Sequence, residues 1–237
     1  MTRRRWIADE VLGNRAYLTG DHARHLAQVL RAKFGQEFDI ATGAEVRRGK
    51  IVSIADDRVE FELGEVLREA ARAEITVAIS IFKFDRMEWA IEKCTELGVA
   101  RIVPVIAART EKHLVQAAPK RAERWRKIAR QAAEQSRQVS SPEVLDPLKL
   151  PELLRDRSGE RIVLSEVENS ISLKNALPPD TSSLTLAFGP EGGWREDELA
   201  AFAKAGWVSA SLGSTILRAE TAVIAAVAVC GTILNRE

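Results

Sequence analysis

Three glycines, a proline and an acid lie within the five residues 189–193, directly after an apolar run. Glycine-rich turns after strands often bind phosphate through backbone N–H groups. The spacing here is G-x-x-G-G, which matches neither the phosphate loop nor the dinucleotide fingerprint, and Glu191 would repel phosphate. The segment therefore predicts either an ordinary tight turn before a helix, or a place where the backbone closely approaches a different ligand.

Two other segments carry polar groups at the end of an apolar run, namely 165–169 and 211–222. In an open parallel sheet, ligands bind beyond the carboxyl ends of the strands. Backbone amides and carbonyls there would read the polar edge of a flat ring, and Leu212, Ile216 and Leu217 would enclose the ring itself.

The elements that must position these segments alternate between strand and helix after residue 74, which predicts an α/β domain with a mostly parallel sheet. Apolar runs and alternation place the strands, and helical periodicity with Pro and Gly signals places the helices. The expected strands are 74–83, 101–107, 161–167, 183–189 and 208–213, and the expected helices are 85–99, 119–138, 195–206 and 219–235.

The first seventy residues have a different pattern, with short alternating strands separated by turn residues, which suggests a small β-barrel. One helix is expected at 21–32, with Ala23, Leu26, Val29 and Leu30 on one face. The composition changes at about 68–74, so we expect two domains, 1–70 and 71–237.

The composition of the 237-residue chain, 46% hydrophobic and 29% charged, is typical of a globular protein. The most apolar stretch, 222–234, is too short to span a bilayer, and no signal-peptide pattern opens the chain, so we expect a cytoplasmic protein. Cys94 and Cys230 are expected to be buried thiols. His22 and His25 lack a third ligand nearby, so no metal site is expected.

Basic residues gather in two zones of a nearly neutral chain. Residues 1–50 carry 10 Lys and Arg against 6 Asp and Glu, and residues 101–137 carry 10 against 3. This pattern favours a local footprint for a polyanion, although a basic helix can also be only a solvated face. The candidate RNA contacts are Arg3, Arg4, Arg5, Arg31, Arg124, Lys127, Arg130 and Arg137.

Five segments together resemble the ribosomal RNA small-subunit methyltransferase E family, which belongs to the SPOUT superfamily. The specific pair is FGPEGGW followed by SLGSTILRAETA; either alone would be a weak signal. The others are KFDRMEWAIEKCTELGVARIVPVIAART, RWRKIARQAAEQSRQVSSPEV and HARHLAQVLRAKFGQEFDI, so the resemblance covers nearly the whole chain.

The resemblance implies an α/β protein with a C-terminal SPOUT-type trefoil-knotted parallel-sheet domain and a small N-terminal PUA-like β-barrel that binds RNA. It implies S-adenosylmethionine as cofactor and methylation of N3 of one uridine of 16S ribosomal RNA, uridine 1498 in the family. The implied cofactor contacts are Leu186, Phe188, Gly189, Pro190, Glu191, Gly192, Gly193, Leu212, Gly213, Ile216, Leu217, Arg218 and Thr221.

Three charged residues are candidates for catalysis. Arg218 would stabilise charge near the methyl centre, and Glu191 or Glu220 would position the base or accept its proton. Simpler roles stay open: Arg218 could pair with either carboxylate, and Glu220 could serve only the dipole of the last helix. No sequence feature selects the general base.

The last helix is apolar nearly all round, so we expect it to be buried on all sides, either between two protomers of a homodimer or in the core of one. The expected partner is 16S ribosomal RNA or the assembled small ribosomal subunit, with no membrane contact. Two alternatives stay open: a SPOUT enzyme that methylates the ribose 2′-hydroxyl, and a non-catalytic RNA-binding module.

Overall fold

The computed structural model describes residues 5–43, 45–55, 57–69, 73–168 and 170–234. The chain divides into two compact units. The first comprises Met1–Ala71 together with Ala133–Ser141, and the second comprises Arg72–Ala132 together with Pro142–Glu237. A segment from the middle of the chain therefore belongs to the N-terminal unit.

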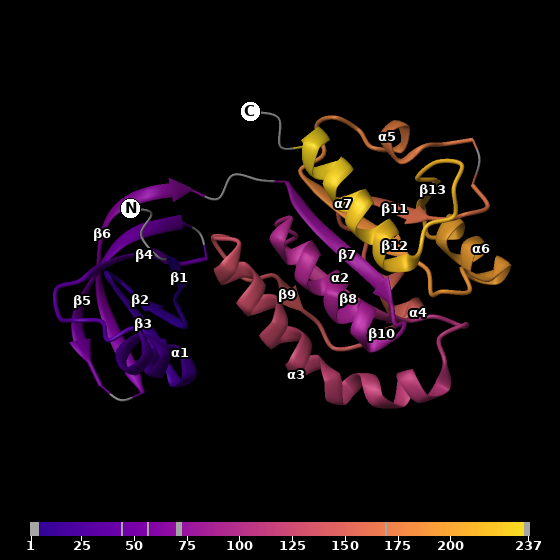
Figure 1. Ribbon diagram of the computed structural model, residues 1–237. Helices are drawn as coiled ribbons and strands as arrows, with labels where there is room; N and C mark the ends of the chain where they lie inside the picture. Colours follow the sequence, from indigo (N-terminus) through magenta and orange to yellow (C-terminus); the bar gives the residue numbers. More distant parts are fainter. Residues whose placement is uncertain (1–4, 44, 56, 70–72, 169, 235–237) are drawn as a thin grey trace. The chain divides into compact units, whose positions relative to one another are not determined.

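A parallel sheet forms the centre of the second unit (Figure 1). Its strand order is β10-β8-β7-β12-β11-β13, with β9 beside β8, and every pair is parallel. The strands are β7 (Glu74–Ser80), β8 (Arg101–Ile106), β9 (Glu143–Val144), β10 (Leu148–Lys149), β11 (Glu160–Leu164), β12 (Ser183–Phe188) and β13 (Val208–Ala210).

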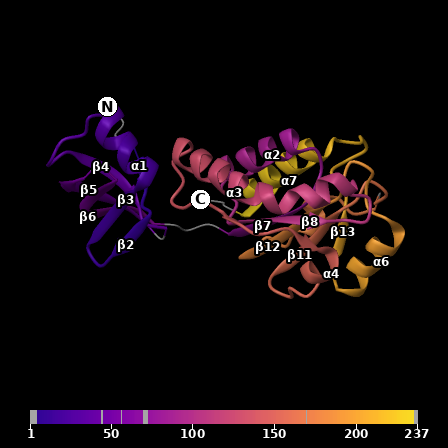
Figure 2. The same cartoon turned by 90° about the horizontal axis from the view of Figure 1, so that it is seen from below.

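Helices cover both faces of this sheet. Successive side chains of a strand point to opposite faces, and in the central strands the side chains on both faces are apolar. On β12, Leu186 and Phe188 face one core and Ala187 faces the other. Figure 2 shows α2, α3 and α7 on one side and α4 and α6 on the opposite side. The helices are α2 (Phe84–Glu96), α3 (Lys112–Gln135), α4 (Leu150–Leu153), α5 (Leu173–Ala176), α6 (Glu196–Lys204) and α7 (Ala219–Leu234).

Helix α3 starts earlier than the sequence pattern predicts. Pro119 lies inside the helix instead of opening it. Leu114 and Ala118, which precede the proline, are buried in the same core as Trp125. This burial holds the preceding residues in the helix although proline removes one backbone hydrogen bond.

The first unit is a curled six-stranded sheet, antiparallel except where β1 pairs with β4. Register shifts along β5 and β6 help the sheet to curl. Its core includes Trp6, Leu18, Phe38 and Phe61. The strands are β1 (Arg5–Ile7), β2 (Glu10–Leu12), β3 (Arg15–Thr19), β4 (Glu37–Ala41), β5 (Glu45–Ile54) and β6 (Arg58–Glu69), in the order β1-β4-β5-β6-β3-β2.

The helix expected at 21–32 is only partly an α-helix. A short α1 (Gly20–Arg24) continues into a π-helical turn, η1 (His25–Val29), where the backbone N–H of Leu30 donates to His25 at 3.0 Å. The wider turn changes the phase of the side chains. The prediction that Val29 and Leu30 share one face with Ala23 and Leu26 is therefore wrong: Ala23 and Leu26 are buried, whereas Val29 and Leu30 are 66% and 37% exposed.

Candidate functional site

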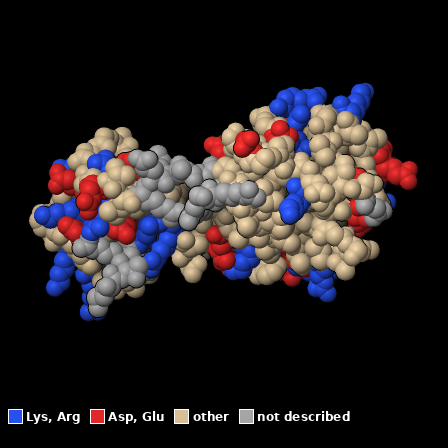
Figure 3. All heavy atoms as spheres, turned by 90° about the horizontal axis from the view of Figure 1, so that it is seen from above, with Lys and Arg blue, Asp and Glu red and all other residues tan. Residues whose placement is uncertain are grey.

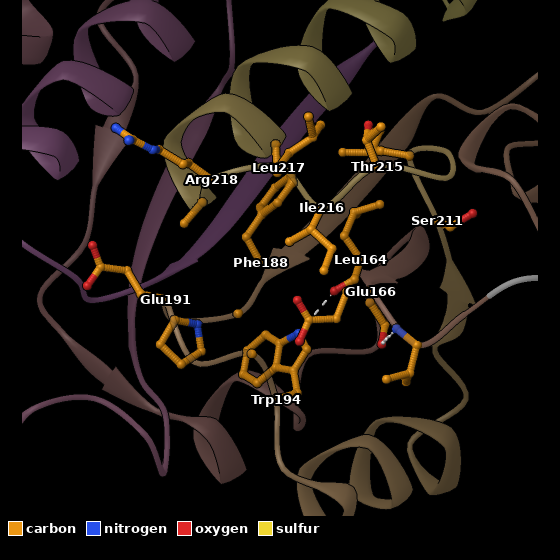
Figure 4. A pocket seen from close by; sticks show the side chains of 18 of the residues that line it. Leu164, Glu166, Phe188, Glu191, Trp194, Ser211, Thr215, Ile216, Leu217 and Arg218 are labelled. Carbon is orange, nitrogen blue, oxygen red and sulfur yellow. Dashed lines mark hydrogen bonds between the residues drawn. The ribbon is translucent and has the colours of Figure 1, made fainter.

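A cavity of about 410 Å³ lies in the second unit, where the carboxyl ends of β11, β12 and β13 meet. Figure 4 shows side chains from all three strand exits around it. The lining comes from residues 164–167, 188–191, 193–194 and 211–219, and from Arg86, Leu199 and Ala222. The structure thus brings together the three segments that the sequence marks as strand exits.

Most of the predicted cofactor contacts line this cavity. Three do not: Leu186 is fully buried in the core, Thr221 is exposed on α7, and a side chain at Gly192 would meet Arg109. The ten that line it are Phe188, Gly189, Pro190, Glu191, Gly193, Leu212, Gly213, Ile216, Leu217 and Arg218.

Two of the loop glycines are needed because other parts of the protein crowd the backbone. At Gly189, a Cβ would lie 3.3 Å from both the backbone N and Nε1 of Trp194. Gly193 has φ +68°, a conformation that favours glycine, and a Cβ there would lie 2.6 Å from Oε1 of Glu166. The loop backbone therefore forms the cavity wall directly.

Trp194 ties the second strand exit to the first. Its Nε1–H donates to the carbonyl of Leu164 at 3.1 Å. Its ring packs edge-on against Phe202 with centroids 4.9 Å apart, and Phe202 packs in the same way against Trp207. This aromatic cluster packs the loop against α6, which carries Phe202.

Arg109 and Glu198 hold the same loop by hydrogen bonds. Arg109 Nη1 donates to the carbonyls of Gly192 and Trp194. The buried Glu198 accepts from the backbone N–H groups of Ala108 at 2.8 Å and Arg195 at 2.9 Å. Both connections join the loop to the residues after β8. They are long-range, so sequence reasoning missed Arg109.

The third strand exit supplies an apolar wall. Leu212, Ile216 and Leu217 line the cavity, and Figure 4 shows Ile216 and Leu217 beside Phe188. The start of this exit is fixed because Ser211 exchanges backbone hydrogen bonds with Ile171 and Leu173, each at 2.9 Å. An apolar wall beside the glycine backbone of the second exit can bind a flat ring: the side chains would contact its faces, and the backbone groups would bind its polar edge.

One arginine that sequence reasoning missed organises the acidic groups. Arg86 Nη1 donates to Glu191 Oε1 at 2.8 Å, and its Nε lies 3.8 Å from Glu220 Oε1. Glu220 is buried, and its Oε2 has no hydrogen-bond partner among the described residues. A signal existed, since Arg86 belongs to a segment that carries the family resemblance.

Arg218 does not form the ion pair with Glu191 or Glu220 that the sequence offered as its simpler role. Glu191 and Glu220 both pair with Arg86 instead. Within the described parts of the chain, the Arg218 side chain has no hydrogen bond or ion pair, and it is exposed. Its guanidinium points away from Ile216 in Figure 4, so it is available to an anion approaching from outside.

The candidate RNA contacts in the first unit differ in their surroundings. Arg3 and Arg4 lie outside the described residues. Arg5 donates to the carbonyl of Arg137. Arg31 is exposed, and both Arg31 and Arg137 have a positive φ, 51° and 58°.

The candidate contacts on α3 are not equally available. Arg124 donates two hydrogen bonds to Glu88, at 2.7 and 2.8 Å, and Arg130 is partly buried. Lys127 is exposed and has no ion pair among the residues that the structure describes. In the face that Figure 3 shows, basic and acidic side chains intermingle on the N-terminal unit, and the larger unit is mostly uncharged.

The two cysteines are buried, free thiols. Burial raises the pKa of the Cys94 and Cys230 thiols to about 12, so both stay protonated at neutral pH. Among the described residues there is no group of three or more His, Cys, Asp or Glu that could hold a metal. In the same ranges, no helix combines the length and apolarity that a membrane span needs.

Comparison with known proteins identifies the family. Residues 69–231 match the RNA methyltransferase domain model. The Bacillus subtilis (strain 168) ribosomal RNA small subunit methyltransferase E is 35% identical over 218 residues, covering 86% of this chain and 85% of that protein. The Rickettsia conorii protein of the same name is 32% identical, covering 89% and 87%.

Solved structures agree in fold. A Neisseria gonorrhoeae ribosomal RNA small subunit methyltransferase E bound to S-adenosylmethionine has a TM-score of 0.84 and 29% identity, covering 98% of each chain. A Legionella pneumophila methyltransferase with bound cofactor has a TM-score of 0.81 and 27% identity, covering 97% of each. The predicted α/β fold, a SPOUT-type domain with an N-terminal barrel, is confirmed, and the chain belongs to the ribosomal RNA small subunit methyltransferase E family.

Proposed function

We propose that this protein transfers a methyl group from S-adenosylmethionine to N3 of one uridine, the family's uridine 1498, in 16S ribosomal RNA. The observation that carries the proposal is the cavity at the three strand exits. Its lining combines apolar side chains and glycine backbone with Glu191, whose carboxylate is held by Arg86.

The residues present fit S-adenosylmethionine. Phe188, Leu212 and Leu217 offer apolar surface to the adenine ring, and the backbone at Gly189 and Gly193 lies open to its polar edge. Glu166 lines the cavity without a hydrogen-bond partner in the described ranges, so it can accept from a hydroxyl or ammonium group. When bound, the cofactor supplies the methyl group on a positively charged sulfur.

The charged side chains at the cavity can support methylation of a uracil at N3. Its N3 carries a proton that must leave when the methyl group arrives, and a carboxylate within reach can accept that proton. Glu191 lines the cavity, and Arg86 occupies only its Oε1, which leaves Oε2 for this role. Glu220 does not line the cavity, so it acts by anchoring Arg86. Arg218 stabilises the negative charge of the base or of a neighbouring phosphate.

The proposal extends to partners. Residues 1–70 form the RNA-binding domain, with 71–237 as the methyltransferase domain, and the substrate is either free 16S ribosomal RNA or the assembled small subunit in the cytoplasm. A homodimer forms through α7, an apolar helix on which the apolar residues Ala228 and Val229 are exposed.

The test is to incubate the purified protein with small subunits or free 16S ribosomal RNA and methyl-labelled S-adenosylmethionine, then digest the RNA to nucleosides. The label is expected in N3-methyluridine. Label on a ribose 2′-oxygen would favour the sister activity instead. Failure to bind the cofactor by calorimetry would make the protein a non-catalytic RNA-binding module.

A further inference from the structure

Three apolar side chains stand in solvent on the N-terminal unit, within one short segment. Val29 is 66% exposed, Leu30 is 37% exposed and Phe34 is 74% exposed. Phe34 is mostly exposed, whereas Phe38 and Phe61 are buried in the core of the same unit. Large apolar side chains that are exposed close together on a surface mark an interaction site.

The backbone produces this exposure. An α-helix over 21–32 would turn Leu30 toward the core beside Leu26, but η1 inserts a wider turn between them. Trp6 packs against His25 with ring centroids 5.9 Å apart, which anchors the turn on its inner side. π-helical turns of this kind often occur at functional sites.

The loop that follows is held in a defined shape. Arg31 adopts φ 51°, a left-handed conformation that is costly for a residue with a side chain. The N–H of Ala32 donates to the backbone carbonyl of Leu26 at 3.1 Å, and the N–H of Gly35 donates to the backbone carbonyl of Ile51 at 2.8 Å. These bonds fix both ends of the loop, so the sheet presents Phe34 on an ordered loop.

Cations flank the apolar cluster. Arg31 and Lys33 are exposed, and in the described parts of the chain neither side chain has an acidic partner. The Cε of Lys50 lies 3.8 Å from where a Cβ of Gly35 would lie, which places a third cation beside the loop. An exposed aromatic ring between unpaired cations complements a ligand that has flat rings joined by phosphates.

We propose that Val29, Leu30 and Phe34 form a stacking platform for an unpaired nucleobase of the RNA substrate, with Arg31 and Lys33 contacting the adjacent phosphates. This inference rests on the proposed function, because it takes RNA as the substrate. Proteins recognise single-stranded RNA by stacking splayed bases on aromatic rings and pairing the backbone with cations. The platform binds unpaired bases of any identity, since every base has a π-face.

A protein partner or a second copy fits the cluster less well. Three side chains supply much less than the roughly 800 Å² per partner that a stable protein interface buries. Unpaired Arg31 and Lys33 would also repel the same cations on a second copy across a symmetric contact. A polyanion neutralises them instead.

The test measures binding of a fluorescent oligouridine by polarisation over a series of salt concentrations. Phe34→Ala should weaken binding about tenfold at every salt concentration, since stacking is worth roughly 1–3 kcal/mol per base. It should leave the slope of log affinity against log salt unchanged. Phe34→Trp should bind at least as tightly as wild type. Lys33→Gln should reduce the slope by about 0.7, the loss of one phosphate contact to a single strand.

Leu12→Ala is the matched control, because Leu12 is an exposed apolar residue, 57% exposed, on β2 of the same unit. The platform is wrong if Phe34→Ala binds like wild type, if Leu12→Ala weakens binding equally, or if wild type does not bind oligouridine. A Phe34→Ala protein that changes its sedimentation coefficient but keeps its RNA affinity would assign the cluster to a second copy. Normal oligouridine binding without methyl transfer would refute the proposed activity and leave the platform standing.

Discussion

Arg86 Nη1 lies 2.8 Å from Glu191 Oε1, which joins the start of α2 to the loop after β12 across 105 positions of the chain. The same guanidinium lies 3.8 Å from buried Glu220 at the start of α7. One cation therefore orients two carboxylates from separate strand exits. We therefore expect the Glu191 carboxylate to lose its orientation when Arg86 is replaced.

Replacing Arg86 should slow methyl transfer while cofactor binding is largely kept. Arg86→Gln removes the ion that orients Glu191, and loss of a positioned proton acceptor costs about 100-fold in kcat. Arg86→Lys should recover only part of the rate, because an ammonium group cannot reach both carboxylates as a planar guanidinium does. Arg101→Gln breaks a surface ion pair of similar length, 2.7 Å to Glu143, and should leave the rate unchanged. A normal rate for Arg86→Gln would exclude this role.

The two adjacent glycines of the loop should respond differently to substitution by alanine. Gly193→Ala forces a side chain into φ +68° and displaces Glu166, so cofactor affinity measured by calorimetry should fall about tenfold or more. Gly192→Ala has no such strain and meets only the flexible Arg109 side chain at 3.3 Å, so its effect should be small. Gly13→Ala has the same backbone strain, φ +59°, with open space around it. It should lower stability by about 1 kcal/mol without affecting cofactor binding, and equal affinities for all three variants would refute the interpretation.

Trp194→Phe should destabilise the protein. It removes the indole N–H that satisfies the carbonyl of Leu164, and an unsatisfied buried carbonyl costs about 1–3 kcal/mol. Urea unfolding should therefore show a lower midpoint with an unchanged slope. Trp89 is exposed on α2, so Trp89→Phe provides the control, and similar midpoints for both variants would contradict the prediction.

The basic face of α3 should contribute to RNA binding through Lys127 more than through Arg124. Lys127→Gln removes an exposed cation, so the slope of log affinity against log salt should become smaller by about 0.7. Arg124 is neutralised by two hydrogen bonds to Glu88, so Arg124→Gln should change the slope less. An unchanged slope for Lys127→Gln would show that this face does not contact RNA.

The dimer proposal needs a substitution on the exposed side of α7. Ala226 is fully buried within one protomer, so Ala226→Glu should unfold the protein whether or not it dimerises. Val229 is 39% exposed, and Val229→Glu should yield a folded monomer by sedimentation with much reduced methyl transfer. A Val229→Glu protein that stays dimeric would place the interface elsewhere, and a fully active monomer would make each site self-sufficient.

The sequence alone determined which segments form the site. Glycine, proline and apolar runs are local signals, and they marked the loops after β11, β12 and β13 correctly because parallel strands bring their carboxyl ends to one edge. Strand–helix alternation also predicted the α/β class, whereas the family resemblance added the cofactor and the SPOUT-type fold, which no local pattern contains.

Only the tertiary structure decided which side chains complete the site and which surfaces stay exposed. Arg86 and Arg109 lie far from the loop in sequence, and their hydrogen bonds depend on how the helices pack on the sheet. Val29 and Leu30 follow a helical pattern, yet the π-helical turn rotates them outward. Pro119 reads as a helix start, yet packing of the preceding turn extends α3. In each case a short-range pattern was overruled by long-range packing or hydrogen bonding, which a local reading of the sequence does not contain.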